Sequence, residues 1–324
     1  MASQPAATAP AGALATTRPE IFLVVNPRSG NGATGRRWSA LEATARGILD
    51  RFEVAHTRGP MDAADITRKA LQEGYRTILA VGGDGTLNEV VNGFFAADGT
   101  PVAPGAAVGI LPQGTGGDFR RSATVPLAWE AAVRHVQAAK PRPIDVGRVR
   151  FRTHAGGEGV RYFLNVASCG ISGAVDAQVN NSSKWMGGKL SFMLASLRAL
   201  LRHKDHRVRV KVDKGAHEEV SITALALGNG QYFGGGMRVA PHAVLDDGQL
   251  GGTIWTGYTL TEFVFLAGKL YSGKHVESPR TRTFQAMRVE VDSDERVLLD
   301  IDGEQPGILP AVFDVMPAAI SLRA

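Results

Sequence analysis

Hydrophobic positions in the first half of the chain form two alternating patterns. The first is a short apolar run, typical of a strand buried on both faces of a sheet. Runs of this kind occupy residues 21–25, 77–81 and 106–111, and a further strand signal lies at 52–56. The second pattern places an apolar residue at every third or fourth position, which predicts a helix with one buried face. These series lie near residues 38–49, 66–71, 86–95 and 127–137. Strands alternating with helices predict a parallel α/β sheet.

The pattern changes after about Pro143. Residues 207–212 alternate strictly between charged and apolar, which predicts a strand with one buried face. Further strand signals, separated by glycine-rich turns, lie at residues 220–227, 251–255, 287–291 and 297–301. We therefore expect a mostly antiparallel β half with one long amphipathic helix near residues 186–202. The prolines in residues 140–143 (KPRP) interrupt helix propensity and mark the boundary between the two halves.

The composition indicates a globular protein but does not identify its binding partner. The 324 residues are 44% hydrophobic and 21% charged, which is ordinary for a globular protein with room for two domains. The net charge of +5 suits an anionic membrane surface, a nucleotide or a nucleic acid, but no nucleic-acid-binding module is visible. A single cysteine, Cys169, excludes an internal disulfide and favours a reducing, cytoplasmic compartment. Residues 1–18 lack a signal peptide's apolar core and are expected to be a disordered tail.

Three glycine-rich turns follow three of the predicted first-half strands. They are NPRSGNG (26–32), GGDGTLN (82–88) and LPQGTGGD (111–118). Ligands of parallel sheets bind at the carboxyl ends of the strands, where these turns fall. Glycine lets backbone N–H groups approach phosphate oxygens closely, and the start of a following helix adds partial positive charge. The three turns together predict a nucleotide phosphate site.

A dinucleotide site is the weaker alternative. Gly30, Gly32 and Gly35 spell G-x-G-x-x-G after a strand. However, four residues separate the first of these glycines from the strand, whereas the dinucleotide motif follows its strand directly. The acidic residue expected about 20 positions later would be Glu53, which lies within the second predicted strand and not at its end.

The motifs NPRSG, GGDGTLNEVVNG and LPQGTGGDFRR, in this order and spacing, resemble the diacylglycerol kinase catalytic family, which includes bacterial lipid kinases, sphingosine kinases and ceramide kinases. Residues 228–250 and the segment LDIDGEQP (299–306) also resemble that family. GGDGT alone is shared with NAD kinases. The resemblance implies an α/β nucleotide domain over residues 19–143 and a β-sandwich lipid-binding domain over 144–310. It also implies that residues 311–324 return to the first domain and that the active site lies between the two.

By the same resemblance, the protein is expected to use ATP and Mg²⁺ to phosphorylate a lipid hydroxyl at the inner face of the membrane, as a monomer or homodimer. Diacylglycerol is the first acceptor to consider, with ceramide, a sphingoid base or a soluble acceptor such as NAD as alternatives. The residues implied in nucleotide binding are Asn26, Arg28, Ser29, Gly30, Thr57, Gly82, Gly83, Asp84, Gly85, Thr86, Asn88 and Thr115. Arg28 is the only cation in its loop and could contact phosphate.

Four carboxylates are expected at or beside the site of transfer. Phosphate would repel Asp84, so Asp84 is expected to act through Mg²⁺ or at the acceptor hydroxyl; the alternative is a turn aspartate. The resemblance implies an essential acid in IDGE, where alternate residues of an extended segment would face one way. We expect Asp302 to be the general base with Glu304 supporting it, leaving open the reverse assignment and an ordinary Asp-Gly hairpin. Asp118 is expected beside the acceptor.

A second acidic turn is VLDDGQ. Its resemblance to bacterial members implies a structural Mg²⁺ held by the side chain of Asp247 and the carbonyl groups of Val244 and Gln249. A plain β-turn is the alternative. The third glycine-rich loop departs from the family form GTxNDFAR, because Gly117 replaces the asparagine and Arg120 replaces the alanine. This removes an amide and adds a charge beside the acceptor but leaves the nucleotide site intact.

Two further segments could meet lipid. Residues 184–201 are amphipathic at helical spacing and could line a lipid entrance, or they could pack on the sandwich. The basic run at residues 202–211 is expected to be mostly a solvated strand face, although that face could also attract anionic lipid.

Overall fold

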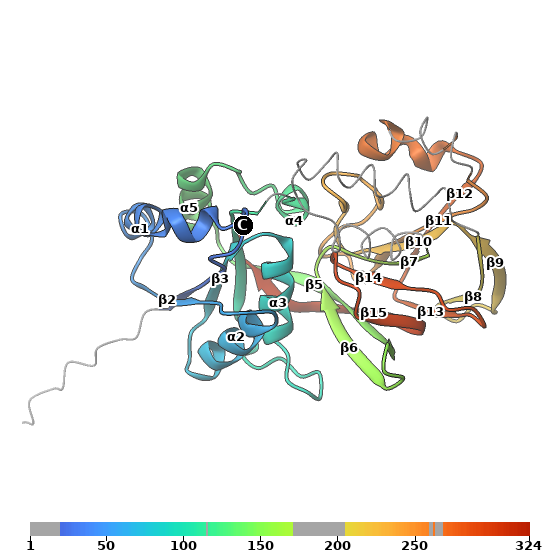
Figure 1. Cartoon of the computed structure of the whole chain (residues 1–324), viewed down its shortest axis with the longest axis horizontal. Coiled ribbons are helices and arrows are strands. Elements are labelled where there is room, and N and C mark those ends of the chain that lie inside the picture. Colours follow the sequence, from blue (N-terminus) through green and yellow to red (C-terminus); the bar gives the residue numbers. More distant parts are fainter. Residues whose placement is uncertain (1–19, 115, 171–204, 259–261, 263–267) are drawn as a thin grey trace, which may run out of the picture.

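The computed structural model describes residues 20–114, 116–170, 205–258, 262 and 268–324. Figure 1 shows two parts side by side, one built of helices around a sheet and the other almost entirely of strands. The predicted helix near residues 186–202 lies outside the described residues. Within the described residues, no helix is both long enough and apolar enough to cross a membrane.

The first part is a parallel sheet covered by helices. Its strands β1 (Ile21–Val25), β2 (Phe52–His56), β3 (Thr77–Gly82) and β4 (Ala107–Pro112) are parallel and run in the order β2-β1-β3-β4. All four match their predicted ranges to within one residue. Every residue of β3 and of β4 is buried, as their unbroken apolar runs predict.

The helices lie in two pairs on opposite faces of this sheet (Figure 1). Helix α1 (Ala33–Arg46) packs beside α5 (Trp129–Ala138), and α2 (Asp62–Gln72) packs beside α3 (Asp84–Gly93). The helices change face where the strand order reverses, between β1 and β3. Such a reversal leaves a crevice at the carboxyl ends of the two strands, which is the usual ligand site of this sheet type.

The second part is a sandwich of two sheets. A five-stranded antiparallel sheet has the order β12-β11-β10-β7-β14, formed by Thr281–Ala286, Leu250–Trp255, Ala224–Gly228, Val166–Gly170 and Leu299–Ile301. The facing sheet contains β5 (Arg142–Thr153), β6 (Glu158–Phe163), β8 (His206–Val212), β9 (Glu218–Ile222), β13 (Arg288–Asp292) and β15 (Gly307–Leu322). Apolar residues of both sheets form one buried core. Two further short helices are α4 (Asp118–Ser122) and η2 (Lys274–Glu277), and the described residues 268–272 are also helical.

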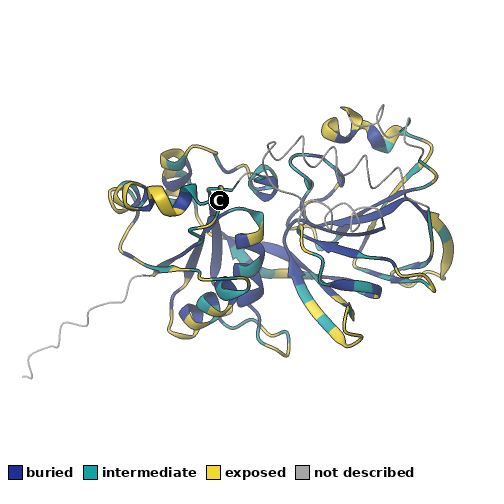
Figure 2. Cartoon of the chain, in the orientation of Figure 1, coloured by how far each residue is buried: buried dark blue, intermediate teal, exposed yellow. Residues whose placement is uncertain are grey.

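The long strand β15 joins the two parts. It pairs antiparallel with β5 and β13, and its end pairs parallel with β4 through Ser321 and Leu322. The parallel sheet and one layer of the sandwich are therefore a single hydrogen-bonded sheet, with the C-terminus inside the first part (Figure 1). Figure 2 shows that burial follows this sheet through both parts, whereas exposed residues lie on helix surfaces, on hairpin ends and along the outer strands β6 and β9.

The prediction of one strand over residues 220–227 is wrong. The segment forms two strands in different sheets, because β9 pairs with β8 whereas β10 pairs with β7 and β11. The chain changes sheets at Thr223, which is buried; its N–H donates to the carbonyl of Trp255 and its hydroxyl donates to Asp205 at 2.8 Å. Both strands are extended and partly apolar, so local periodicity does not reveal the break.

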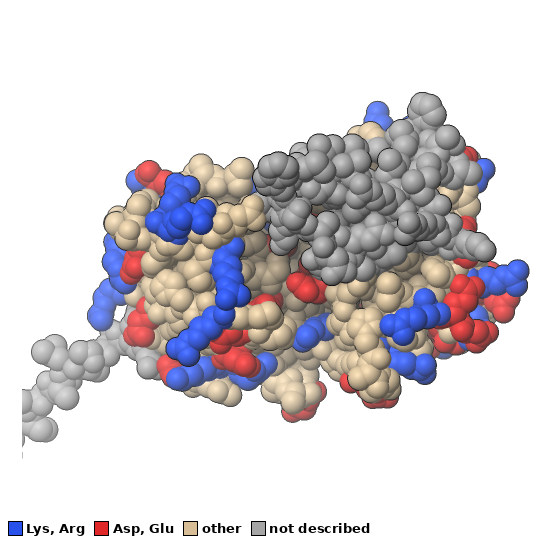
Figure 3. Space-filling view, in the orientation of Figure 1, with Lys and Arg blue, Asp and Glu red and all other residues tan. Residues whose placement is uncertain are grey.

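The basic run on β8 is largely paired with acids. Arg209 forms ion pairs with Asp292 and Asp294, and the imidazole of His206 lies 2.7 Å from Glu295. Lys211 lies 3.9 Å from Glu290. Figure 3 shows positive and negative side chains intermingled at this end of the molecule. The described part of the run therefore offers less unpaired positive charge to anionic lipid than its sequence indicates.

Candidate active site

The three glycine-rich loops meet at the carboxyl ends of β1, β3 and β4. Backbone N–H groups of Gln113 and Gly114 donate to the carbonyl of Gly82 at 2.7 and 3.1 Å. A Cβ on Gly114 would lie 2.4 Å from the Cα of Gly83, and a Cβ on Gly30 would lie 2.8 Å from the Gln113 carbonyl oxygen. The loops thus touch through their backbones, and only glycine allows this approach.

Side chains of the first loop connect it to the second. The amide of Asn26 donates to the hydroxyl of Thr86 at 3.0 Å and accepts the backbone N–H of Arg28 at 2.9 Å. The Ser29 hydroxyl donates to the Asn26 carbonyl and lies 2.6 Å from the hydroxyl of Thr34. Asn26 and Ser29 therefore shape the loop, while the side chain of Arg28 is exposed and has no partner among the described residues.

Helix α3 begins inside the second loop without a side-chain cap. Gly83 precedes it with φ −103° and ψ −170°, and within the described part of the chain no side-chain hydrogen bond caps the helix. These N–H groups carry the partial positive charge of a helix start, which attracts anions. A Cβ on Gly82 would lie 2.4 Å from the Thr86 hydroxyl, so the turn into the helix requires glycine. This geometry suits the phosphate site that the loop motif predicts.

A cavity of about 460 Å³ opens in front of these loops. Its walls come from both parts of the chain: the first loop, the segment that leads into α2, helix α3, strand β6 and the turn after β14. The lining residues are Asn26, Arg28, Thr57, Gly59, Pro60, Met61, Ala63, Thr86, Asn88, Glu89, Arg161, Ile301, Glu304, Gln305 and Pro306. Of the residues predicted at the nucleotide, Thr115 lies outside the described residues. Arg161 and Glu89 were not predicted: Arg161 belongs to no motif, and Glu89 lies within GGDGTLNEVVNG without an expected role.

The IDGE segment is a tight hairpin. Ile301 and Glu304 exchange backbone hydrogen bonds of 2.9 and 3.1 Å, and Asp302 and Gly303 have φ values of 50° and 90°. Positive φ at both central residues is the type I′ turn for which Asp-Gly is favoured. The expectation that Asp302 and Glu304 face the same way on an extended segment is therefore wrong, because the backbone of Asp302 has the left-handed conformation and the segment is not extended.

The two acids consequently have different surroundings. The carboxylate of Asp302 accepts the backbone N–H groups of residues 164, 165 and 166 and the side-chain amide of Asn88, at 2.9–3.1 Å. Burial nevertheless raises the pKa of Asp302 to about 6, against the lowering effect of these hydrogen bonds. Glu304 is exposed, lines the cavity and comes within 4.0 Å of a Cβ placed on Gly85.

Two asparagines of the LNEVVN segment attach α3 to the free edge of β6. The side-chain amides of Asn88 and Asn92 both donate to the carbonyl of Tyr162, at 3.0 and 2.9 Å, and Asn92 also accepts the Tyr162 N–H. Asn88 borders the cavity, but its amide group is shared between β6 and Asp302. The nucleotide loop is thereby linked to the acidic turn through one side chain.

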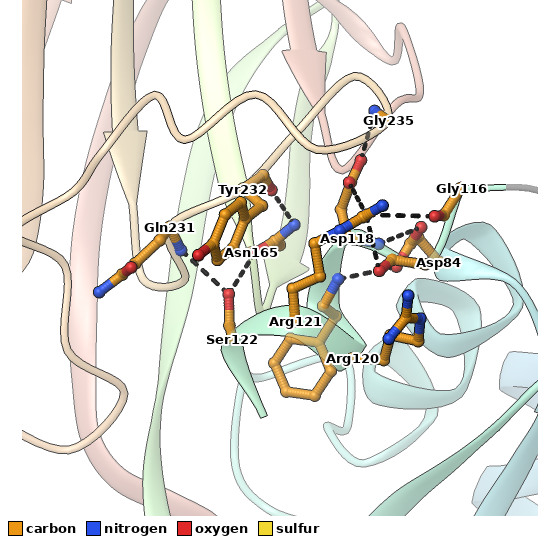
Figure 4. Close-up of polar contacts among 12 residues, drawn as sticks. Asp84, Gly116, Asp118, Arg120, Arg121, Ser122, Asn165, Gln231, Tyr232 and Gly235 are labelled. Atoms are coloured by element: carbon orange, nitrogen blue, oxygen red, sulfur yellow. Dashed lines mark hydrogen bonds and ion pairs between the residues drawn. The ribbon is translucent and has the colours of Figure 1, made fainter. Parts of the chain in front are cut away.

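Asp84 has a definite partner in the third loop. Its two carboxylate oxygens accept the backbone N–H groups of Asp118 and Phe119, each at 3.0 Å, and so cap the start of α4 (Figure 4). Asp118 is buried; it accepts the N–H of Gly235 at 2.8 Å and forms an ion pair with Arg121 at 2.8 Å. Burial, and then the charge of Asp84, raise the pKa of Asp118 to about 6. These contacts connect the GGDG loop with Gly235, which lies in the segment between β10 and β11 of the sandwich.

The two departures from the family loop are neighbours in space. Gly117 has φ 68°, and a Cβ on it would lie 3.0 Å from Nε of Arg120. The Arg120 side chain thus lies over Gly117, in the space that an asparagine at this position would enter. Gly117 and Arg120 are therefore best understood as one coupled change.

The VLDDGQ segment is a turn in which one of the two carboxylate oxygens of Asp247 accepts a short hydrogen bond. One carboxylate oxygen of Asp247 accepts the N–H of Gln249 at 3.0 Å, and the other has only a long 3.4 Å contact with Gln285. Burial raises the pKa of Asp247. Among the described residues, no three His, Cys, Asp or Glu side chains group as metal ligands. A carboxylate with one open oxygen and nearby carbonyls fits Mg²⁺ in kind, and the metal at Val244, Asp247 and Gln249 stays a prediction.

The first part is a parallel sheet with glycine-rich loops at its switch point, and it is continuous with a β-sandwich whose acidic turn borders the same cavity. The chain is therefore a two-part protein, an α/β part followed by a β-sandwich, with a candidate site where the two parts meet. Comparisons with known proteins agree. The model of the diacylglycerol kinase catalytic domain matches residues 20–149, and that of the YegS C-terminal NAD kinase beta sandwich-like domain matches residues 165–324.

Relatives match over almost the whole chain. A diacylglycerol kinase of Bacillus subtilis (strain 168) is 30% identical over 301 residues, which are 90% of this chain and 91% of the relative. A probable lipid kinase YegS-like of Enterobacter sp. (strain 638) is 27% identical over 95% of this chain and 96% of its own. The chain belongs to the diacylglycerol kinase family, which confirms the resemblance seen in the motifs. The predicted enzyme class, a lipid kinase, agrees with the names of these relatives.

A solved structure has the same fold. A putative diacylglycerol kinase from Bacillus anthracis str. Sterne superposes with a TM-score of 0.72 at 22% identity, covering 93% of this chain and 96% of that chain. This likeness and the sandwich match confirm the predicted fold class, an α/β part followed by a β-sandwich.

Proposed function

We propose that the protein is an ATP-dependent lipid kinase that transfers the γ-phosphate of ATP to a lipid hydroxyl, with diacylglycerol the first candidate. One observation carries this proposal: the uncapped start of α3 and the Glu304 carboxylate, supplied by different parts of the chain, border one cavity or its edge. Phosphoryl transfer needs such an arrangement, with phosphate held on one side and a proton acceptor for the attacking hydroxyl on the other. The names of the relatives support lipid as the acceptor class.

On the nucleotide side, the chain offers backbone N–H groups and the exposed cation of Arg28. Gly82, Gly83, Gly85 and Thr86 surround the start of α3, where phosphate oxygens would accept N–H bonds. Asn26 and Ser29 hold the facing loop in shape, and Arg28 is free to reach phosphate. Thr57 lines the same cavity from the end of β2.

The surroundings of the two acids favour Glu304 as the general base. All four hydrogen bonds to the Asp302 carboxylate come from donors that fix the turn, so its lone pairs are committed. Glu304 lines the cavity and faces the start of α3. Asp302 then acts by positioning the turn, which reverses the assignment expected from the sequence.

Mg²⁺ would supply neutralisation of the phosphate charge. Each oxygen of Asp84 accepts one N–H, which leaves a lone pair on each for a metal or its water. Asp84 is therefore the residue of this chain that we propose to hold the catalytic Mg²⁺. The structural Mg²⁺ at Asp247 is a separate proposal.

The substrate is reached from outside the bilayer in this proposal. The protein would associate peripherally with the inner face of the membrane, consistent with its net charge of +5. Ceramide or a sphingoid base is the second acceptor class, because Gly117 and Arg120 change the loop beside Asp118, which we propose lies next to the acceptor. This departure from the family loop weakens the inference to diacylglycerol without choosing between the alternatives.

The test is transfer from radiolabelled ATP to mixed micelles containing diacylglycerol, ceramide, a sphingoid base or phosphatidylglycerol, with and without Mg²⁺. We expect Mg²⁺-dependent labelling of diacylglycerol. Folded protein that labels none of these lipids would refute the proposal, and labelling of ceramide alone would select the second acceptor class.

Substitution of the two acids tests the assignment of the base. We expect Glu304→Gln to lower kcat by about 10²- to 10⁴-fold, the usual contribution of a general base, with ATP binding retained. Asp302→Asn is the comparison, and we expect it to lower thermal stability as well as activity. Near-normal turnover of Glu304→Gln would return the role to Asp302.

A further inference from the structure

The cavity contains a second arginine that no motif accounts for. Arg161 lies on β6 and comes from the second half of the chain, whereas Arg28 comes from the first loop. Neither side chain makes a hydrogen bond or an ion pair with another described residue. Most other arginines described in the structure have such partners, as Arg209 and Arg121 illustrate.

The backbone around Arg161 is held firmly. Arg161 pairs with Val149 on β5, and the next residue, Tyr162, exchanges hydrogen bonds with Asn88 and Asn92 of α3. The ring of Tyr162 stacks on Phe95 with centroids 4.0 Å apart. Successive side chains of a strand point to opposite faces, so Arg161 is directed away from this contact. Figure 1 shows β6 beside α3, where the two parts of the chain meet.

Two permanently charged groups in one cavity repel each other unless an anion lies between them. Arginine does not lose its proton in proteins, so the charge cannot be removed by titration. Glu89, an acid in the same wall, accepts the N–H of Ala63 at the start of α2. An added polyanion would neutralise both arginines, and the planar guanidinium matches phosphate oxygens in two-point contacts.

We infer that Arg161 binds the terminal phosphates of the nucleotide, together with Arg28, and holds the transferred phosphate toward Glu304. The inference rests on the proposed use of ATP. It adds a phosphate contact from the second part, so that a triphosphate binds both parts of the chain at once. AMP lacks the β- and γ-phosphates and does not use this contact.

The experiment compares Arg161→Met with wild type and with Arg152→Met, a matched control. Arg152 is exposed on β5 of the same hairpin and does not line the cavity. Isothermal titration measures the affinity for ATP, inorganic tripolyphosphate and AMP. We expect Arg161→Met to weaken the affinity for ATP and for tripolyphosphate about tenfold to a hundredfold, as for loss of a charged hydrogen bond. The affinity for AMP should stay within about twofold of the wild-type value. Arg161→Lys keeps the charge and should recover part of the loss.

The inference is overturned if Arg161→Met binds tripolyphosphate with wild-type affinity. It is also overturned if the affinity for AMP falls by the same factor as the affinity for ATP. Its failure differs from failure of the proposed function. Wild type that phosphorylates lipid while Arg161→Met binds and turns over ATP normally refutes only the role of Arg161. If the wild-type protein labels no lipid and Arg161→Met still abolishes tripolyphosphate binding, the phosphate contact is supported. The proposed lipid kinase activity is then refuted.

Discussion

Asp302 combines two opposing influences in one side chain. Four N–H donors favour its charged form, while burial and the nearby charge of Asp84 disfavour it, and burial is the largest of these effects. The left-handed backbone at Asp302 makes those donors reachable, because the turn directs the carboxylate back toward residues 164–166. A residue that is suited to a tight turn is thus also the residue that joins the acidic turn to α3.

A pH dependence of stability follows from the pKa of Asp302. Its pKa is about 6 when folded and 3.8 ordinarily, so the folded state binds the proton more tightly. The stability from this group is therefore fully present below pH 3.8 and is lost as the pH rises through about 6. We expect the free energy of unfolding of wild type, relative to Asp302→Asn, to fall between pH 4 and pH 7. Urea titrations at several pH values measure it, and a constant difference across this range would contradict the assigned shift.

At the scale of elements, α3 is the connection between the nucleotide loop and the rest of the chain. Its start faces the cavity, Asn88 and Asn92 attach it to β6, and Gly93 at its end touches α2. The motif GGDGTLNEVVNG therefore specifies a docked helix as well as a phosphate loop. Its asparagines satisfy the free edge of a strand, which would otherwise leave backbone groups unpaired.

Gly93→Ala tests this close packing. A Cβ on Gly93 would lie 2.4 Å from the Ala64 carbonyl oxygen and 2.6 Å from Cβ of Thr67, so α2 and α3 must move apart. We expect a loss of about 1–3 kcal/mol in the free energy of unfolding, measured with urea, as for an overpacked core. Gly268→Ala is the control, since a Cβ there meets nothing within 4 Å. Equal stability of the two variants would show that α2 and α3 are not tightly packed.

At the scale of the whole molecule, β15 makes the two parts one structure. Its end adds a strand to the parallel sheet beside β4, and Arg323 donates to the carbonyl of Val136 at 2.9 Å. Leu322 is fully buried there. The cavity has walls from both parts, so its shape depends on this shared strand.

Leu322→Ala tests that dependence. Removing a fully buried leucine side chain typically costs about 2–5 kcal/mol, and we expect a loss of that size in the free energy of unfolding. Leu127→Ala is a matched control, because Leu127 is 60% exposed and should change stability by no more than about 0.5 kcal/mol. Calorimetry should show a single transition that shifts as a unit. Two separate transitions, with only one shifted, would indicate that the parts unfold independently.

The sequence predicted local features, such as strand positions, better than features that depend on contacts between distant residues. The strands of the first part were predicted to within one residue. Three of them, β1, β3 and β4, are apolar runs because they are buried on both faces, whereas β2 is only partly buried. Residues 220–227 were not predicted correctly, since a change of sheet at Thr223 alters the pairing partner and not the local pattern. Arg161 carried no signal at all, because its importance depends on which cavity its strand borders.

By itself, the sequence determined the alternation of strands and helices in the first part, the three glycine-rich loops and the family resemblance, because periodicity and turn chemistry act over a few residues. Only the tertiary structure decided how the acids differ. Asp302 contacts Asn88, which is 214 positions away in the chain, and Asp84 caps a helix that starts 34 positions later. Such contacts depend on how the two parts meet, so whether a carboxylate is committed to N–H donors or left facing the cavity appears only in the folded chain.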